Sequence, residues 1–509
     1  MSRLHAQDVI NAIIESKAVL FHDQYKEPYI APEGNGSRII RLSTKEFKHW
    51  LSAFCYKEFG KALSTVTAAN VVQALCGNAI YRNDMIPLSV RYVLKNGVYW
   101  YDLGKSAVRV DKNGWTIEKV PPILFRRYSH QMPQVVPLKG GNLDFKHFVN
   151  IEKDNELMLF TVFTVSAFIP DFPHPLLVLS GPQGAGKSTP MRLLKELIDP
   201  SVIKGVPAPN DGAAFAQFAY HHAFMFFDNL SGMKPWFSDA LARASTGDGF
   251  SKRALFSDDD DVIYIIQRPI AINGISQVIT KADLLDRSIL IGLKRIDPNL
   301  RLSEDEFWTT FYDHRARLLG AIFTLLSKAL EIIDNVELDW HPRMADFARW
   351  GYAIAEVAGL GGDNFVEAYK ANIEKQDEEA IEANPAAQAL ISYMEDREEW
   401  EGTASELLKD LNNYVGFTSG LRDSYLWPKD AARLSIKLNE VEPNLMSRGI
   451  SLKRYTSKLR RITKVINENL VKANKEAEAL EAEAKNDENS KSVESVNTQS
   501  EINLDDIPF

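Results

Sequence analysis

The sequence of 509 residues is poor in cysteine and has no long hydrophobic run. Its two cysteines, Cys55 and Cys76, are too few for a four-cysteine zinc site, an iron–sulfur cluster or a disulfide framework, and their scarcity indicates a reducing compartment. Met1–Leu20 lacks the apolar core of a signal peptide, and the most apolar run, Leu157–Ile169, is too short to cross a membrane. We therefore expect a cytoplasmic protein with no membrane partner, and a buried helix at Leu157–Ile169.

Charge is distributed unevenly along the chain. The net charge is −9, but residues 474–509 carry ten acids and three lysines, which leaves −2 for the rest. Leu445–Val465 contains seven lysines and arginines and no acid. A basic segment beside an acidic tail suggests a nucleic-acid partner, with a merely solvated surface as the alternative.

Length and patterning predict an α/β protein of several domains. We expect an N-terminal α+β domain (1–145), a P-loop ATPase core (146–300), a helical segment (301–384), a DNA-binding domain (385–470) and a flexible acidic tail (471–509). The first domain should contain a hairpin turning at Asn96-Gly97. A charged connector is expected at Lys375–Asn384, just before Pro385.

Three short apolar runs alternate with helical sequence in the core, at Leu176–Leu179, Ala223–Phe227 and Pro269–Ile272. This alternation predicts a parallel sheet, and each run ends at a polar residue. The carboxyl ends of parallel strands are where open α/β sheets bind ligands. We therefore expect the site at this edge.

The strongest motif is Gly181-Pro-Gln-Gly-Ala-Gly186-Lys187-Ser188, which has the P-loop spacing between a predicted strand and a predicted helix. Glycines let backbone N–H groups surround a triphosphate, and the helix N-terminus favours anions. Lys187 would contact the β- and γ-phosphates, and Ser188 would bind Mg²⁺. The expected ATP-binding residues are Gly181, Gly184, Ala185, Gly186, Lys187, Ser188 and Thr189.

Polar residues at the ends of the next two strands complete the predicted site. Asp228 suits a magnesium partner, and Asn273 could bridge water and the γ-phosphate, although Asn273-Gly274 could also be a simple turn. Many ATPases have a glutamate after this aspartate as the base, but here the residue is Asn229, so another carboxylate acts or positioning alone suffices. Asp248 is an alternative carboxylate.

Arg287 follows the short helical sequence that includes Asp283. An arginine in this place suits an arginine finger that reaches a neighbouring subunit's γ-phosphate. A surface ion pair with Asp283 is the alternative. The predicted catalytic residues are Lys187, Asp228, Asn229, Asn273 and Arg287, with Ser188 and Asp228 at the metal.

This order of motifs resembles the AAA+ core of superfamily 3 helicases, and more closely the helicase half of primase–helicases from phages, plasmids and integrated elements. The resemblance rests on Gly181–Ser188, Phe226–Leu230, Pro269–Ile275 and Asp283–Arg287 and covers roughly residues 145–350. It implies a hexameric ring in a bacterial host cytosol that translocates on single-stranded DNA with ATP and Mg²⁺. It also implies a nucleotide-sensing role for Arg343.

The resemblance also implies DNA contacts. Ala244–Gly249 with Lys252 and Arg253 resembles the family's DNA-contacting hairpin, and we expect the adjacent Asp258–Asp261 at its outer turn. Two helical patterns followed by a basic turn resemble a winged-helix domain, with a protein-docking face as the alternative. The expected DNA-binding residues are Lys252, Arg253, Lys453, Arg454, Lys458 and Arg460.

The chain ends in Leu504–Phe509, which resembles the acidic tip of bacterial single-stranded-DNA-binding proteins. Partner docking is assigned to Asp505, Asp506, Ile507, Pro508 and Phe509. Host replication and repair proteins are the expected partners, through an apolar anchor beside acids that meet a basic rim. An ordinary disordered end is the alternative.

These features predict an ATP-hydrolysing DNA helicase or translocase in the replication of a phage or other mobile element. The first alternative is an ATPase switch that loads or remodels replication or defence proteins and binds DNA without unwinding it. The second is a DNA-binding adaptor whose ATP site governs assembly only. A primase role is doubted, because residues 1–145 contain no visible catalytic carboxylate cluster.

Overall fold

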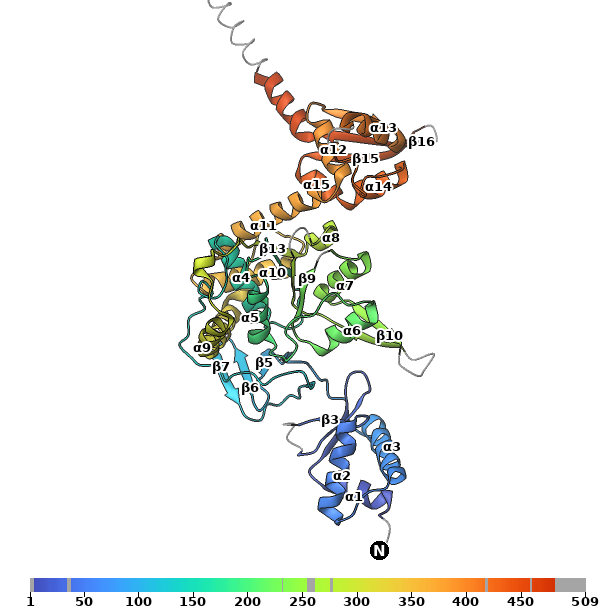
Figure 1. Ribbon diagram of the computed structural model, residues 1–509, viewed down its shortest axis with the longest axis vertical. Coiled ribbons are helices and arrows are strands. Elements are labelled where there is room, and N and C mark those ends of the chain that lie inside the picture. The colour runs from blue at the N-terminus through green and yellow to red at the C-terminus, as the bar shows by residue number, and fades with distance from the viewer. Residues whose placement is uncertain are drawn as a thin grey trace, which may run out of the picture. The chain divides into compact units, whose positions relative to one another are not determined.

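The computed structural model describes residues 4–33, 38–230, 232–253, 261–274, 278–416, 420–457 and 460–480 (Figure 1). The chain forms two compact units, one of residues 1–279 with 286–375 and one of residues 280–285 with 376–509. The domain boundaries expected near residues 145 and 300 fall inside the first unit. The boundary expected near residue 385 lies close to residue 376, where the longer segment of the second unit begins. The mixed α/β class expected from the sequence is confirmed.

The N-terminal part of the first unit packs helices against a small antiparallel sheet in the order β1-β2-β3. Its helices bury apolar residues that recur at helical spacing, as with Val71, Leu75 and Ala79, which are all fully buried. The elements are α1 (Ala6–Glu15), β1 (Val19–His22), β2 (Pro28–Ala31), β3 (Ile40–Arg41), α2 (Lys45–Phe59) and α3 (Thr65–Tyr81).

A second antiparallel sheet follows, of β4 (Tyr92–Lys95), β5 (Val98–Asp102), β6 (Ala107–Asp111) and β7 (Gly114–Glu118). The predicted hairpin is confirmed, because Lys95 pairs with Val98 and the two turn residues, Asn96 and Gly97, have φ of 53° and 75°. Trp115 of β7 donates from its ring N–H to Thr324 of helix α9 (Glu304–Ile332) at 3.0 Å. This sheet therefore shares its core with the segments that follow, which is why residue 145 does not separate compact units.

The central sheet is parallel, as predicted, and its described strands lie in the order β13-β8-β12-β9. Buried apolar residues fill these strands because helices cover the sheet. The strands are β8 (Leu176–Ser180), β9 (Met225–Leu230), β12 (Ile270–Gly274) and β13 (Ser288–Gly292). The connecting elements are α5 (Ser188–Ile198), α6 (Gly212–His221), α7 (Pro235–Thr246), β10 (Gly249–Arg253), β11 (Asp261–Ile265) and α8 (Ala282–Leu285).

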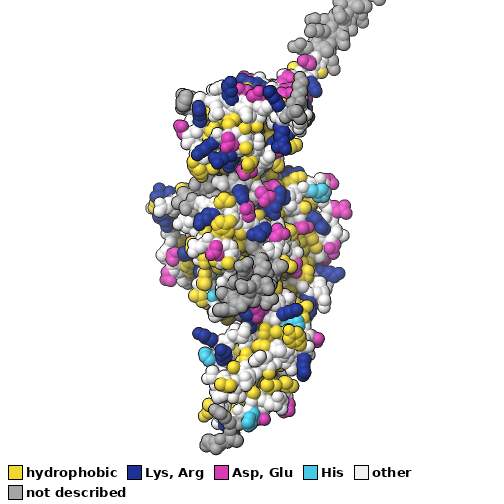
Figure 2. All heavy atoms as spheres, turned by 90° about the vertical axis from the view of Figure 1, so that its right-hand side faces the viewer, with side chains coloured by type: hydrophobic (Ala, Val, Ile, Leu, Met, Phe, Trp, Pro, Cys, Tyr) yellow, Lys and Arg dark blue, Asp and Glu magenta, His cyan; other side chains and the backbone are white. Residues whose placement is uncertain are grey.

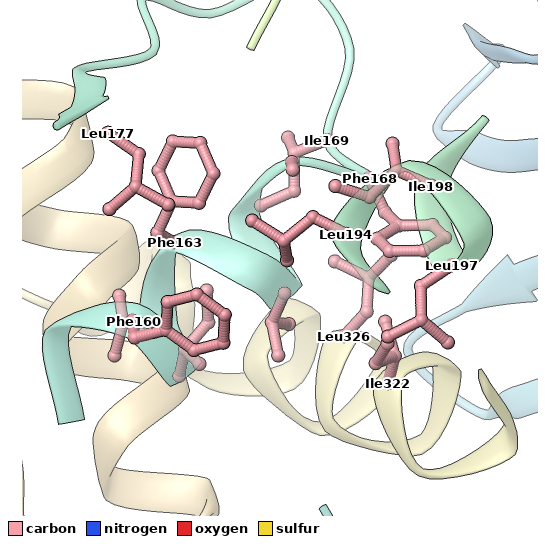
Figure 3. Close-up of a cluster of buried hydrophobic side chains, with 14 of the residues drawn as sticks. Phe160, Phe163, Phe168, Ile169, Leu177, Leu194, Leu197, Ile198, Ile322 and Leu326 are labelled. Carbon is pink, nitrogen blue, oxygen red and sulfur yellow. The ribbon is translucent and has the colours of Figure 1, made fainter. Parts of the chain in front are cut away.

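The predicted buried helix is α4 (Asp154–Ser166). Figure 3 shows side chains of α4, α5 and α9 meeting in one cluster of buried side chains, among them Phe163, Leu194 and Ile322, which are fully buried. Helix α5, which begins at the P-loop, is thus held along its length by apolar contacts. Burying one such side chain is worth about 1.5–3 kcal/mol, so the start of α5 is firmly positioned.

The end of α5 is fixed by a buried charge network around Asp199. Lys195 Nζ donates to Asp199 Oδ2 at 2.8 Å and to the Phe224 carbonyl at 2.8 Å, and Arg91 Nε lies 3.2 Å from Asp199 Oδ1. Burial alone would raise the pKa of Asp199, but Lys195, His222 and Arg91 together hold it well below its ordinary value. Asp199 therefore stays ionised and ties α5 to β9 and to the segment before β4.

Helices follow the central sheet, as the sequence predicted. They are α9, α10 (Ala345–Val357) and α11 (Gly362–Glu382), with short 3₁₀ turns η1 (Pro298–Leu300) and η2 (Ile333–Asn335). The charged connector predicted at Lys375–Asn384 is wrong, because α11 continues to Glu382. Glutamate, lysine, glutamine and alanine dominate that segment, and they are strong helix formers. The break comes at Asn384, whose side chain caps α12 (Pro385–Met394).

The second unit has a three-stranded antiparallel sheet in the order β14-β16-β15. The two predicted helices and the basic hairpin after them are confirmed. The elements after α12 are β14 (Glu399–Gly402), α13 (Ala404–Val415), α14 (Ala431–Glu440), α15 (Glu442–Ser447), β15 (Ile450–Ser457) and β16 (Arg460–Asn467). Residues 468–480 are helical. Among the described helices none is long and apolar enough to span a membrane.

Candidate nucleotide site

The loop after β8 takes a backbone path that glycine makes possible. Gly181 has φ of 155°, and a Cβ at this position would lie 2.3 Å from the Leu293 carbonyl oxygen. Gly186 has φ of 73°, in the left-handed region that residues with a side chain rarely adopt. The loop therefore packs closely against the residues after β13 and turns directly into α5.

Lys187 and Ser188 lie where the loop becomes a helix. Lys187 Nζ donates to the carbonyl oxygens of Gly181 and Pro182 at 2.7 and 3.0 Å. Burial lowers the pKa of Lys187, and the nearby Asp228 carboxylate acts in the opposite direction. Ser188 is the first residue of α5, so its hydroxyl stands beside the positive end of the helix.

The ends of β8, β9 and β12 bring Ser188, Asp228 and Asn273 into contact. Ser188 Oγ donates to Asp228 Oδ1 at 2.9 Å, and Asn273 Nδ2 donates to the same oxygen at 2.8 Å. Asn273 is 1% exposed, so its amide is held rigidly. Residues separated by 40 and 45 positions meet because parallel strands end at one edge of the sheet.

Asn229, beside Asp228, has φ of 55°, an uncommon backbone conformation for a residue with a side chain. Its N–H donates to Asn273 Oδ1 at 2.6 Å, which secures this turn of the chain. Asn273 thus holds the backbone of Asn229 with its oxygen and the Asp228 carboxylate with its amide. The exposed Asn229 side chain can orient water but cannot accept a proton.

A cavity of about 590 Å³ opens over these groups. The described residues that line it are Gln183, Gly184, Ala185, Gly186, Lys187, Ser188, Thr189, Arg192, Asp228, Asn229, Asn273 and Glu304. Gln183, Arg192 and Glu304 were not predicted to be functional. Arg192 lies four residues after Ser188, one turn along the same helix face, and this spacing could have identified it. No local sequence pattern marks Glu304 as functional, since it is distant in sequence from the P-loop.

The residues in the cavity fit a magnesium–triphosphate complex. A hydroxyl and a carboxylate oxygen suit Mg²⁺, which is bound through few protein oxygens together with phosphates. The glycine loop and Lys187 suit the phosphates themselves. In the described part of the chain no group of three or more His, Cys, Asp or Glu residues could hold a metal ion.

Arg287 lies far from the P-loop of its own chain. Strand β13 pairs with β8 so that Ser288 faces Leu176 and Gly292 faces Ser180. The Arg287 carbonyl accepts from the Leu176 N–H at 2.8 Å, so Arg287 stands at the start of β8, while the P-loop follows its end. The five residues of β8 span about 16 Å.

Arg343, proposed as a sensor, has its Nη1 3.4 Å from Asp286 Oδ2. Neither Arg343 nor Asp248 lines the cavity.

The first predicted DNA contacts lie on the antiparallel hairpin of β10 and β11, where Lys252 pairs with Val262 and Arg253 with Asp261. The hairpin itself is confirmed. The side chains of Lys252 and Arg253, and residues 258–260, lie outside the described part of the chain. Their DNA contacts stay a prediction.

The basic hairpin β15–β16 carries the second predicted set of DNA contacts, and Figure 2 shows Lys and Arg side chains on the C-terminal unit at the top of the view. Lys453 and Arg460 are exposed, whereas Arg454 pairs with Glu442 at 2.8 Å. Arg461, which the sequence analysis did not select, is equally exposed. Lys458 and the terminal residues 505–509 lie outside the described residues.

Comparisons with known proteins give two matches to family models. Residues 143–379 match the model described as "Actinomycete integrative conjugative element replication protein". Residues 386–479 match the model described as "AICE RepA C-terminal domain". No curated protein sequence matches the chain.

Three solved structures show weak similarity to this chain. Two are apo structures of the NrS-1 C-terminal region, with 9% and 10% identity and TM-scores of 0.40 and 0.41, each covering 91% of this chain and 100% of the other. A JCV helicase with a bound acetamide compound has 12% identity and a TM-score of 0.22 and covers 41% of this chain and 67% of the other. From the family models, this chain shares two domains, over residues 143–379 and 386–479, with the replication proteins of actinomycete integrative conjugative elements.

Proposed function

We propose that this chain is an ATP-dependent DNA helicase or translocase of the superfamily 3 AAA+ type that replicates a mobile element. The observation that carries the proposal is the contact of Ser188 and Asn273 with one oxygen of Asp228, beside a glycine loop closed by Lys187. The match to replication proteins of integrative conjugative elements supports a role in replication. Binding of ATP and Mg²⁺ is part of the proposal.

Each residue of the site has a distinct task in ATP hydrolysis. Backbone N–H groups of the loop hold the phosphates. Lys187 gives up its hydrogen bonds to the loop carbonyl oxygens and neutralises the charge of the phosphates. Ser188 and Asp228 would hold Mg²⁺, which would neutralise phosphate charge when it is bound. Asn273 orients Asp228 through its side-chain amide nitrogen, which also lies 3.5 Å from Ser188 Oγ.

The position of Arg287 supports a ring of several copies, with a hexamer as the family expectation. Because Arg287 stands at the opposite end of β8 from its own P-loop, an arginine finger at this position would act on the nucleotide site of another copy. An arginine supplied from a neighbour contributes about 10³–10⁵ to the rate of phosphoryl transfer in other NTPases. Hydrolysis would then require assembly.

Two hairpins supply the proposed DNA contacts. In a ring, β10–β11 with Lys252 and Arg253 would face the channel. In the second unit, the order helix, strand, three helices and a basic antiparallel hairpin supports a winged-helix domain that binds DNA through Lys453, Arg460 and Arg461. Such contacts neutralise phosphates, so binding should weaken strongly as salt rises.

A second candidate function is an ATPase switch or loader that binds DNA without unwinding it. Asn229 favours this alternative, because the position that often holds the catalytic glutamate carries an amide and slow turnover suits a switch. Strand displacement on a forked duplex, measured beside ATP turnover, separates the two. A helicase unwinds with wild-type chain and not with Lys187→Ala. Turnover without unwinding supports the switch, and DNA binding without turnover supports an adaptor.

The tail tip Asp505–Phe509 is proposed as a docking peptide for host replication and repair proteins. The support is its sequence alone, an apolar end beside two acids. A chain that lacks Pro508 and Phe509 should no longer retain these host proteins in a pull-down. Unchanged retention contradicts the proposal.

A further inference from the structure

The nucleotide cavity contains a second carboxylate that has no task in the mechanism above. Among the described residues lining it, the carboxylates are Asp228 and Glu304. Asp228 Oδ1 is already engaged by Ser188 and Asn273, which suits a magnesium partner. Asn229 cannot accept a proton. Glu304 is therefore the remaining group on the cavity wall that can act as a base.

Three observations describe how Glu304 is held on the wall of the nucleotide cavity. Glu304 is the first residue of α9, whose start is fixed by a capping box of Ser303 and Glu306, with Oγ–Oε2 at 2.8 Å. Its Oε1 lies 3.4 Å from Arg192 Nη1. Arg192 lies one turn after Ser188 on α5, and side chains in helices lean towards the N-terminus, which here is the P-loop. The pair therefore stands on the same helix face as the Ser188 hydroxyl.

Arg192 and Asp228 line both the nucleotide cavity and a second cavity. A smaller adjoining cavity of about 290 Å³ is lined by Arg192 and Asp228 together with residues of α5 and α9 and the segment at Lys204. The Glu304 side chain is largely exposed, 85%, and that of Arg192 is 39% exposed. Both can thus adjust their rotamers without disturbing a packed core.

We propose that Glu304 is the general base of ATP hydrolysis and that Arg192 is its positioning residue. Glu304 takes a proton from the attacking water as the water oxygen forms a bond to the γ-phosphorus. The bond from the γ-phosphorus to the β–γ bridging oxygen breaks, and its electron pair leaves with ADP. The proton passes from Glu304 to phosphate or bulk water. This inference rests on the proposed ATPase function.

The test compares purified Glu304→Gln with wild type and with the matched control Asp305→Asn, which changes an exposed neighbouring carboxylate that does not line the cavity. Glu304→Gln should lower the single-turnover hydrolysis rate about 10²–10³-fold and leave the Kd for a fluorescent ATP analogue within about threefold. Nucleotide recovered with the variant after incubation with Mg²⁺ and ATP should be ATP, and with wild type ADP. Asp305→Asn should match wild type in all three.

Arg192 is tested by its effect on kcat against KM. Arg192→Ala should lower kcat with little change in KM, and Arg192→Lys should restore part of it, because a lysine can still pair with Glu304. Hydrolysis by Glu304→Gln at the wild-type rate overturns the inference. The inference is also overturned if Glu304→Gln needs more Mg²⁺ but reaches the wild-type rate at saturating Mg²⁺, since Glu304 would then help to bind the metal. If wild type binds no ATP, the proposed function itself fails.

Discussion

Asn273 offers the sharpest test of the nucleotide site, because one buried side chain holds two of its elements. Its amide donates to Asp228 Oδ1 at 2.8 Å, and its oxygen accepts from the Asn229 N–H at 2.6 Å. Asn273→Ala removes both bonds at a position that is 1% exposed. The hydrogen bond to the charged carboxylate is worth about 1.5–3 kcal/mol, which corresponds to a roughly 10- to 150-fold loss of turnover if it acts in the transition state.

Comparing Asn273→Ala with Asn273→Asp should separate the contribution of the amide donor from that of the side-chain shape. Asn273→Asp has nearly the same shape, but it lacks the donor and adds a second negative charge beside Asp228, so its turnover should fall at least as far as that of the alanine variant. Nucleotide affinity should change less than turnover, because the loop and Lys187 are untouched. The control is Asn70→Ala, on the exposed face of α3.

ATP turnover per folded chain is the measurement, with thermal unfolding recorded for each variant to correct for lost stability. An Asn273→Ala chain that hydrolyses ATP within twofold of wild type would falsify the role given to this residue. Equal turnover of the alanine and aspartate variants, both reduced, would show that the donor matters and the added charge does not.

Three further predictions concern assembly, stability and DNA. Arg287→Ala should reduce ATP turnover on the order of 10³-fold. Mixing it with the inactive Lys187→Ala chain should restore activity, because the first chain supplies Lys187 and its neighbour supplies Arg287 to one complete site. No recovery of turnover argues against a site shared between two chains. Asp199→Asn should lower the unfolding free energy by about 3–5 kcal/mol at neutral pH. Because the folded state lowers the pKa of Asp199, this stabilisation is lost below about pH 4, so the difference from wild type measured by denaturant titration should narrow on acidification; a constant difference contradicts it. Lys453→Ala and Arg461→Ala should each reduce the salt slope of DNA binding by about one in fluorescence anisotropy, and an unchanged slope excludes a phosphate contact.

The sequence was sufficient for features that local spacing encodes. The loop Gly181–Ser188 is readable because its glycines and lysine are consecutive, and the strands ending at Asp228 and Asn273 are readable because buried parallel strands are continuous apolar runs. Spacing also predicted the Asn96-Gly97 turn. It failed at Lys375–Asn384, where charge suggested a connector but helix-forming residues extend α11 to Glu382.

The tertiary structure decided which of these pieces meet. The strand order β13-β8-β12-β9 brings Asn273 against Asp228 and sends Arg287 to the opposite end of β8. The packing of α9 beside α5 brings Glu304 to Arg192 across 112 positions of chain. No local pattern encodes such a contact, because it depends on how apolar faces distant in sequence pack together. The sequence therefore determined the phosphate-binding loop, and the packing of sheet and helices determined the groups around it.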